Sequence, residues 1–120
     1  MNNNKELGKI GEIVSCKYLE NNQYQIIQKN YVCKQGEIDI IAKEKNEYVF
    51  IEVKTRKNKK FGYPIDAITN CKKKHIYSSA KNYLYCNSLF NELIRFDVIE
   101  VYYIKNKFLI HHLKNVEISR

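Results

Sequence analysis

Ionisable side chains interrupt two apolar segments between Gly36 and Arg56. The first segment carries Glu37 and Asp39, and the second carries Glu52 and Lys54. A carboxylate that is buried without a partner is strongly destabilising, so these acids require a cation or contact with water. Oxygen ligands of this kind are the ones that Mg²⁺ prefers. We therefore expect a divalent metal at this stretch, and our working hypothesis is a nuclease active site.

Two strands of a hairpin would hold these residues, from Glu37 to Lys43 and from Tyr48 to Thr55. Successive side chains of a strand point to opposite faces. If both apolar faces pack on the same core layer, the buried residues are Ile38, Ile40, Val49, Ile51 and Val53. The charged residues Asp39, Glu52 and Lys54 then emerge together on the other side.

A helix is predicted from Lys5 to about Asn21, because apolar residues recur at spacings of three and four. Its apolar stripe comprises Leu7, Ile10, Ile13, Val14, Tyr18 and Leu19. Gly8 and Gly11 are unfavourable in a helix unless another segment approaches the backbone closely. Glu12 lies on the flank of the stripe, and the pattern alone favours an ordinary surface glutamate.

The remaining elements complete one mixed layered structure. A strand from Tyr24 to Cys33 precedes the hairpin, and a basic loop over residues 56–64 follows it. A helical pattern resumes near Ile65, with a main helix capped by Thr69 or Asn70 that ends near Tyr85. Its buried side is expected to comprise Ile68, Ile76, Ala80, Tyr83 and Leu84. Two strands follow, from Ile94 to Ile104 and from Phe108 to Leu113, with His111 and His112 interpreted as strand-surface residues.

This order predicts a single α/β domain over residues 1–120, with a mixed β-sheet flanked by helices. The length of 120 residues suits one hydrophobic core. No apolar run is long enough to span a membrane, and the first residues lack the apolar segment of a signal peptide, so we expect a cytoplasmic protein. The four cysteines are far apart in the sequence and are interpreted as reduced.

The positive charge is concentrated in the second half of the chain. Residues 1–53 hold seven Lys and eight acids, whereas residues 54–120 hold 14 Lys and Arg and five acids. A basic field that begins beside a group of acids is what a metal-dependent enzyme acting on a polyanion requires, since the phosphates must be drawn toward carboxylates. A solvated, lysine-rich surface explains the charge equally well.

Five motifs in order give the chain a resemblance to a known family. They are Gly8-x-x-Gly11-Glu12, Gly36-Glu37-Ile38-Asp39, Phe50-Ile51-Glu52-Val53-Lys54-Thr55-Arg56, the region of Lys72, and Arg95-Phe96-Asp97-Val98. An Asp followed on the next strand by Glu-x-Lys resembles the PD-(D/E)xK nucleases, which have the restriction-endonuclease-like fold. The whole set resembles more closely the YraN family of small uncharacterised proteins, related to the archaeal Holliday-junction resolvases. Ile38 stands where many members of the superfamily have Pro.

The resemblance implies roles for individual residues. Asp39 and Glu52 would bind Mg²⁺, with Mn²⁺ as an alternative, together with the backbone carbonyl of Val53. Lys54 would lie beside the attacking water. Glu12 would correspond to the first-helix glutamate of the resolvases, and it or Glu37 would orient the water or help to hold a second metal. The expected phosphate contacts are Arg56, Lys57, Lys59, Lys60 and Lys72.

The implied substrate is DNA, either branched or double-stranded, and the relatives' use of paired sites suggests a homodimer. An alternative is a non-catalytic nucleic-acid-binding module that keeps the nuclease fold, in which the acids would pair with Lys54 and Arg56. A protein-interaction scaffold is a third interpretation. Binding of Mg²⁺ that depends on Glu52 distinguishes the enzyme from the binding module, and salt-sensitive binding of nucleic acid distinguishes both from the scaffold.

Overall fold

The structure is a computed structural model that describes residues 4–56 and 69–118. The elements are α1 (Asn4–Asn21), β1 (Gln25–Cys33), β2 (Gly36–Glu44), β3 (Glu47–Arg56), α2 (Asn70–Cys86), β4 (Leu93–Ile104) and β5 (Lys107–Leu113). The predicted order of helix, three strands, helix and two strands is confirmed. The part of the basic loop over residues 57–64 and the start of the helical pattern, including Ile68, lie outside the described residues.

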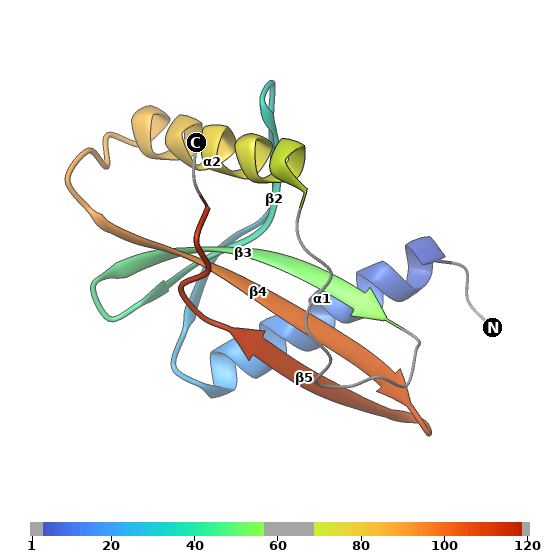
Figure 1. The fold of residues 1–120 in the computed structure, drawn as a ribbon. Coiled ribbons are helices and arrows are strands. Elements are labelled where there is room, and N and C mark those ends of the chain that lie inside the picture. The colour runs from blue at the N-terminus through green and yellow to red at the C-terminus, as the bar shows by residue number, and fades with distance from the viewer. Residues whose placement is uncertain (1–3, 57–68, 119–120) are drawn as a thin grey trace.

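Five strands form one mixed sheet in the order β1-β2-β3-β4-β5. Neighbouring strands are antiparallel except β3 and β4, which are parallel, and α2 belongs to the connection between them. Figure 1 shows α1 on one face of the sheet and α2 on the other. This is the mixed α/β arrangement with flanking helices that the sequence predicts for a restriction-endonuclease-like domain.

Both faces of the central strands are buried. On the α1 face, Cys16 and Leu19 pack against Ile40, Val49 and Ile51. The α2 face is formed by Ala80, Tyr83, Ile38, Ile41 and Phe50. The prediction that Ile38 packs with Ile40 is therefore wrong. In a regular strand Ile38 and Ile40 would share a face, so their packing against opposite helices shows that the alternation of β2 is interrupted between them, at Asp39.

The buried face of α1 differs from the predicted apolar stripe at one residue. Leu7 and Leu19 are buried as expected, but Ile13 is 59% exposed. Ser15 and Cys16 are buried on the helix instead. On α2, the predicted buried residues Ile76, Ala80 and Tyr83 are confirmed, and Thr69 is the N-cap.

A polar network on the α1 face joins the two ends of the chain. Arg95 forms two hydrogen bonds with Asp97, Nε to Oδ1 and Nη2 to Oδ2, each of 2.9 Å. His112 Nε2 lies 2.7 Å from Asp97 Oδ2, and its Nδ1 lies 2.8 Å from the Tyr18 hydroxyl. Arg95 also donates to the Tyr24 hydroxyl over 2.6 Å. The side chain of His112 is only 5% exposed, so its interpretation as a strand-surface residue is wrong.

Burial opposes the ionisation of Asp97, but hydrogen bonds from His112 and Arg95 outweigh this effect and lower the pKa of its carboxyl group. Arg95 also forms ion pairs at the β2–β3 turn. Its Nη1 lies 2.9 Å from Glu44 Oε1 and 3.3 Å from Glu47 Oε1. The network therefore connects α1, the hairpin, β4 and β5.

Gly11 allows α1 to lie directly against β3. A Cβ atom at Gly11 would be 2.0 Å from Thr55 Oγ1 and 3.2 Å from Thr55 Cβ. This close approach explains a glycine at a helix-interior position and places the next residue, Glu12, beside the sheet. At Gly8, by contrast, a Cβ would have no atom within 4 Å beyond the adjoining helix backbone.

Gly11→Ala is expected to lower the free energy of unfolding by roughly 1–3 kcal/mol, because Thr55 must shift to make room. Gly8→Ala is the matched control and should be neutral or stabilise by up to about 1 kcal/mol through helix propensity. Urea unfolding measures both. Adding Thr55→Ala to Gly11→Ala should recover part of the loss, and a stabilising Gly11→Ala would contradict the close packing.

The four cysteines are free, as expected. Within residues 4–56 and 69–118, no helix has the length and apolar character needed to cross a membrane.

Candidate active site

Asp39 and Glu52 meet where β2 and β3 stop pairing. The backbone register of the hairpin runs from Glu44 opposite Glu47 to Ile40 opposite Ile51. At the next position, Asp39 Oδ2 accepts a hydrogen bond of 2.8 Å from the Val53 backbone N–H. The carboxylate thus takes the place of a strand partner, which fixes it between the two strands beside Glu52.

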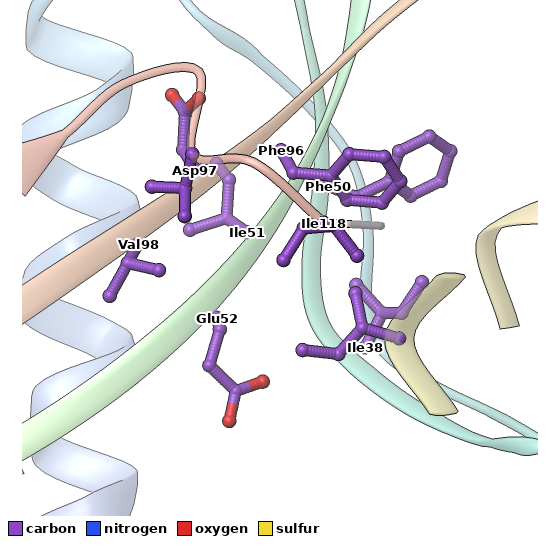
Figure 2. Close-up of a pocket in the computed structure, with 10 residues that line it drawn as sticks. Ile38, Phe50, Ile51, Glu52, Phe96, Asp97, Val98 and Ile118 are labelled. Carbon is purple, nitrogen blue, oxygen red and sulfur yellow. The ribbon is translucent and has the colours of Figure 1, made fainter. Parts of the chain in front are cut away.

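Glu52 stands at the rim of a small apolar pocket between the sheet, α2 and the C-terminal segment (Figure 2). The apolar residues that line it are Ile38, Phe50, Ile51, Ile76, Phe96, Val98, Val116 and Ile118. Figure 2 shows the Glu52 carboxylate turned away from the side chains of Phe50 and Ile118. The Asp97 carboxylate points in another direction, toward the network around Arg95, and does not join Glu52.

Both carboxyl groups of the pair hold their protons more strongly than a free carboxyl group. Burial, followed by the charge of Asp39, raises the pKa of Glu52 to about 7. Burial also raises the pKa of Asp39, although the hydrogen bond from Val53 partly offsets the effect. Two adjacent acids with this behaviour are stabilised by a cation, since a cation removes both the repulsion and the cost of burial.

A lysine from α2 contacts this pair. Lys72 Nζ lies 3.3 Å from Glu52 Oε2, with the lysine side chain 40% exposed and the glutamate 12% exposed. The Thr69 hydroxyl accepts a hydrogen bond of 3.1 Å from the Lys72 backbone N–H and so fixes the start of the helix. Lys72 was predicted to contact phosphate, and in the structure its ammonium group lies against a predicted metal ligand.

Lys54 is half-buried on the same strand as Glu52, and its positive charge opposes the rise in the pKa of Glu52. Lys54 pairs in register with Glu100 of β4. The Glu100 carboxylate is buried and accepts from Arg56 Nε over 3.2 Å, while His111 Nδ1 lies 2.8 Å from it. Arg56 is therefore held by an acid of the next strand, an arrangement that the sequence pattern did not predict.

Glu12 approaches the pair from α1. Burial, followed by the charge of Asp39, raises the pKa of Glu12, and a hydrogen bond with the Asn30 side chain opposes this rise. Glu37 is exposed near the start of β2, and its charge acts on both Glu12 and Asp39. An open cleft beside them is lined by Lys9, Glu12, Ile13, Lys29 and Asn30.

The structure therefore brings Glu12, Asp39, Glu52 and Lys72 together and adds Asn30, which was not among the residues predicted from the sequence. Asn30 lies in β1 with a positive φ of 55°, an unusual conformation inside a strand. The one sequence signal for Asn30 was an asparagine within a predicted strand, where apolar and β-branched residues are usual. Lys57, Lys59 and Lys60 lie outside the described residues.

The carboxylate pair has the composition of a magnesium site. In the described ranges, no group of three or more His, Cys, Asp and Glu side chains could hold a metal ion. Mg²⁺ is commonly bound by one or two carboxylates and keeps several waters, so two carboxylates suffice. Their raised pKa values indicate that a cation would relieve the repulsion and the cost of burial within the pair.

Comparison with models of protein families shows to which family the chain belongs. The model for the uncharacterised protein family UPF0102 matches residues 11–101. The chain belongs to the UPF0102 family. This confirms the YraN-like membership that the motifs predicted, and the matched region includes Glu12, Asp39, Glu52, Lys54 and Lys72.

Several UPF0102 proteins match nearly the whole chain. One from Clostridioides difficile is 49% identical over 113 residues, covering 94% of this chain and 97% of its own. Another, from Caldicellulosiruptor saccharolyticus, is 46% identical over 115 residues, covering 94% and 98%. The crystal structure of SSO0001 aligns with a TM-score of 0.40 and 18% identity over 91% of this chain. The alignment covers 51% of SSO0001, so the UPF0102 chain spans about half of its length.

The raised pKa of Glu52 predicts how the stability of this UPF0102 protein depends on pH. Between the ordinary glutamate pKa of 4.5 and the folded-state value of about 7, the folded protein binds more protons than the unfolded chain. The free energy of unfolding of the metal-free protein should therefore fall as the pH rises through this window, by roughly 1–3 kcal/mol. Glu52→Gln should flatten the dependence.

Urea unfolding at several pH values without metal tests this prediction. Glu92→Gln is the matched control, because Glu92 is exposed and its replacement removes the same charge. A wild-type protein that becomes more stable as the pH rises from about 5 to about 8 would contradict the assignment of Glu52 as a buried, repelled acid.

Proposed function

We propose that this UPF0102 protein is a Mg²⁺-dependent nuclease that hydrolyses phosphodiester bonds of DNA in the cytoplasm. The observation that carries the proposal is the meeting of Asp39 and Glu52 at the point where β2 and β3 separate. Two acids that repel one another there are costly for a protein that only has to fold. They are useful for binding a metal ion at a phosphate.

Asp39 and Glu52 would hold Mg²⁺, or Mn²⁺ in its place, together with the backbone carbonyl of Val53. In a strand, the N–H and C=O of one residue face the same neighbour. Since the Val53 N–H donates to Asp39, its carbonyl lies toward β2 as well. When bound, the ion polarises the phosphoryl oxygens and lowers the pKa of water.

The protein's own residues would then orient the reactants. Lys54, two residues after Glu52, would neutralise the negative charge that develops on the phosphate as water attacks and the P–O bond to the leaving oxygen breaks. Glu12 has a raised pKa and lies near Asp39, so it could accept the proton of the water or help to hold a second ion. Glu37 is the second candidate for this role.

DNA would be held mainly through its phosphates. Arg56 is positioned by Glu100, and Lys73 follows Lys72 on the first turn of α2. Together with Lys57, Lys59, Lys60 and Lys72, these cations would give an affinity that falls with salt and depends little on sequence. Branched DNA is the favoured substrate because of the resemblance to Holliday-junction resolvases, and two sites in a homodimer would cut both strands.

One observation favours the second candidate, a non-catalytic nucleic-acid-binding module. Glu52 is already paired with Lys72, as the acids of such a module would be with basic neighbours. A binding module should bind DNA equally well in chelator, whereas the nuclease should bind Mg²⁺ in a manner that depends on Glu52.

A cleavage screen tests the nuclease proposal. Purified protein is incubated with linear, nicked, flapped and four-way-junction DNA, with Mg²⁺ or Mn²⁺ and with chelator. We expect cleavage that requires the metal and is strongest on branched DNA. Cleavage that persists in chelator, or no cleavage of any of these substrates, would contradict the proposal.

A further inference from the structure

The contact between Lys72 and Glu52 competes with metal binding, because it occupies one of the two carboxylate oxygens of Glu52. Lys72 Nζ lies 3.3 Å from Glu52 Oε2. Mg²⁺ binds carboxylate oxygen at about 2.0–2.1 Å and carries its own shell of waters. An ammonium group held against the same carboxylate would be repelled by the ion at close range. An ion bound through Oε2 would displace Lys72, and an ion bound through Oε1 would repel it at close range.

We propose that Lys72 is a positioning residue that neutralises the Asp39–Glu52 pair in the metal-free protein and leaves Glu52 when the metal binds, so that its ammonium group becomes available to the substrate phosphate. This rests on the proposed function. It assigns Lys72 two successive partners, a carboxylate and then a phosphate, where the sequence predicted only the second.

The surroundings of Lys72 allow its side chain to move while its backbone stays fixed. The backbone N–H is held by the Thr69 cap over 3.1 Å, and Ile76, one turn further along α2, is buried against the sheet. The side chain itself is 40% exposed. A lysine side chain is long and flexible, so its ammonium group can change partner without displacing the helix.

The electrostatics favour this exchange of partners. Without metal, Lys72 contacts Glu52, and its charge also reaches Asp39, where it favours the ionised carboxylate. With metal, the ion supplies more positive charge at closer range, so the attraction that holds Lys72 is cancelled. A phosphate that arrives at the metal then offers the displaced ammonium group a new anionic partner.

The exchange predicts that Lys72 competes with the metal. Lys72→Met removes the competing charge, so Mn²⁺ alone, without DNA, should bind about 3- to 10-fold more tightly than to wild type, equivalent to roughly 0.7–1.4 kcal/mol. Lys72→Arg keeps the charge and should bind like wild type. Lys74→Met is the matched control, because Lys74 is exposed two residues further along the same helix and its replacement changes the net charge equally.

Isothermal titration calorimetry with Mn²⁺ at about pH 8 provides the measurement. Lys72→Gln serves if Lys72→Met does not fold. Binding by Lys72→Met and Lys72→Gln that is equal to or weaker than that of wild type, with binding lost in Glu52→Gln, would overturn the role of Lys72 and leave the metal site intact. Absence of binding by wild type and by every Lys72 variant would overturn both proposals. Tighter binding by Lys74→Met of the same size would also overturn the specific role of Lys72.

Discussion

Asp39→Asn should lower Mg²⁺-dependent cleavage of DNA by about 1,000-fold or more, because the several kcal/mol of charge stabilisation that a bound ion supplies depends on its ligands. Asparagine has the size of aspartate, and its amide oxygen can still accept the hydrogen bond from the Val53 N–H. The local structure should therefore be kept while the negative charge is lost. Glu52→Gln should have an effect of similar size.

The fold and DNA binding of Asp39→Asn separate a chemical effect from a structural one. Burial already disfavours the charged form of Asp39, so its neutral replacement should not lower the melting temperature. Loss of a negative charge near the phosphates should leave DNA affinity unchanged or increased. Glu92→Gln, at an exposed site, should retain full cleavage. Wild-type cleavage by Asp39→Asn would show that the acids are not catalytic.

Arg95→Met is expected to lower the free energy of unfolding by about 3–5 kcal/mol, because it leaves the buried carboxylate of Asp97 without its main charged partner. The arginine also connects Asp97 to Tyr24 and to Glu44 of the hairpin turn. Methionine fills much of the space of the arginine stem and supplies none of its hydrogen bonds. The loss should therefore come from charge and hydrogen bonding rather than from a cavity.

Urea unfolding at neutral pH measures the effect of Arg95→Met. Lys107→Met is the control, since Lys107 is exposed on β5 and the same type of charge is removed. Combining Arg95→Met with Asp97→Asn should cost less than the sum of the single changes, because the unpaired charge is then gone. A loss below about 1 kcal/mol would show that the network contributes little to folding.

The architecture followed from short-range patterns in the sequence. Alternating residues from Tyr48 to Thr55 and apolar spacings of three and four in α1 depend only on the geometry of a strand and a helix. The motifs were sufficient to identify the family, and the geometry of the hairpin was sufficient to predict that Asp39 and Glu52 lie side by side. These features require no knowledge of what packs on the sheet.

The contacts of these residues with distant parts of the chain depended on the tertiary structure. Ile38 packs toward α2 and Ile40 toward α1 because the alternation of β2 is interrupted at Asp39, which the local pattern of residues did not indicate. Gly11 brings α1 against Thr55 and so places Glu12 near Asp39. Lys72 reaches Glu52 only because α2 lies on that face.

The same reason applies to the network around Asp97. Arg95 and Asp97 are two residues apart on β4, so the sequence could have placed them on one face, but His112 and Tyr18 come from opposite ends of the chain. Local geometry therefore determined which elements form and which of their side chains share a face. Long-range packing alone decided which side chains meet, because that depends on how elements distant in the sequence are arranged around the sheet.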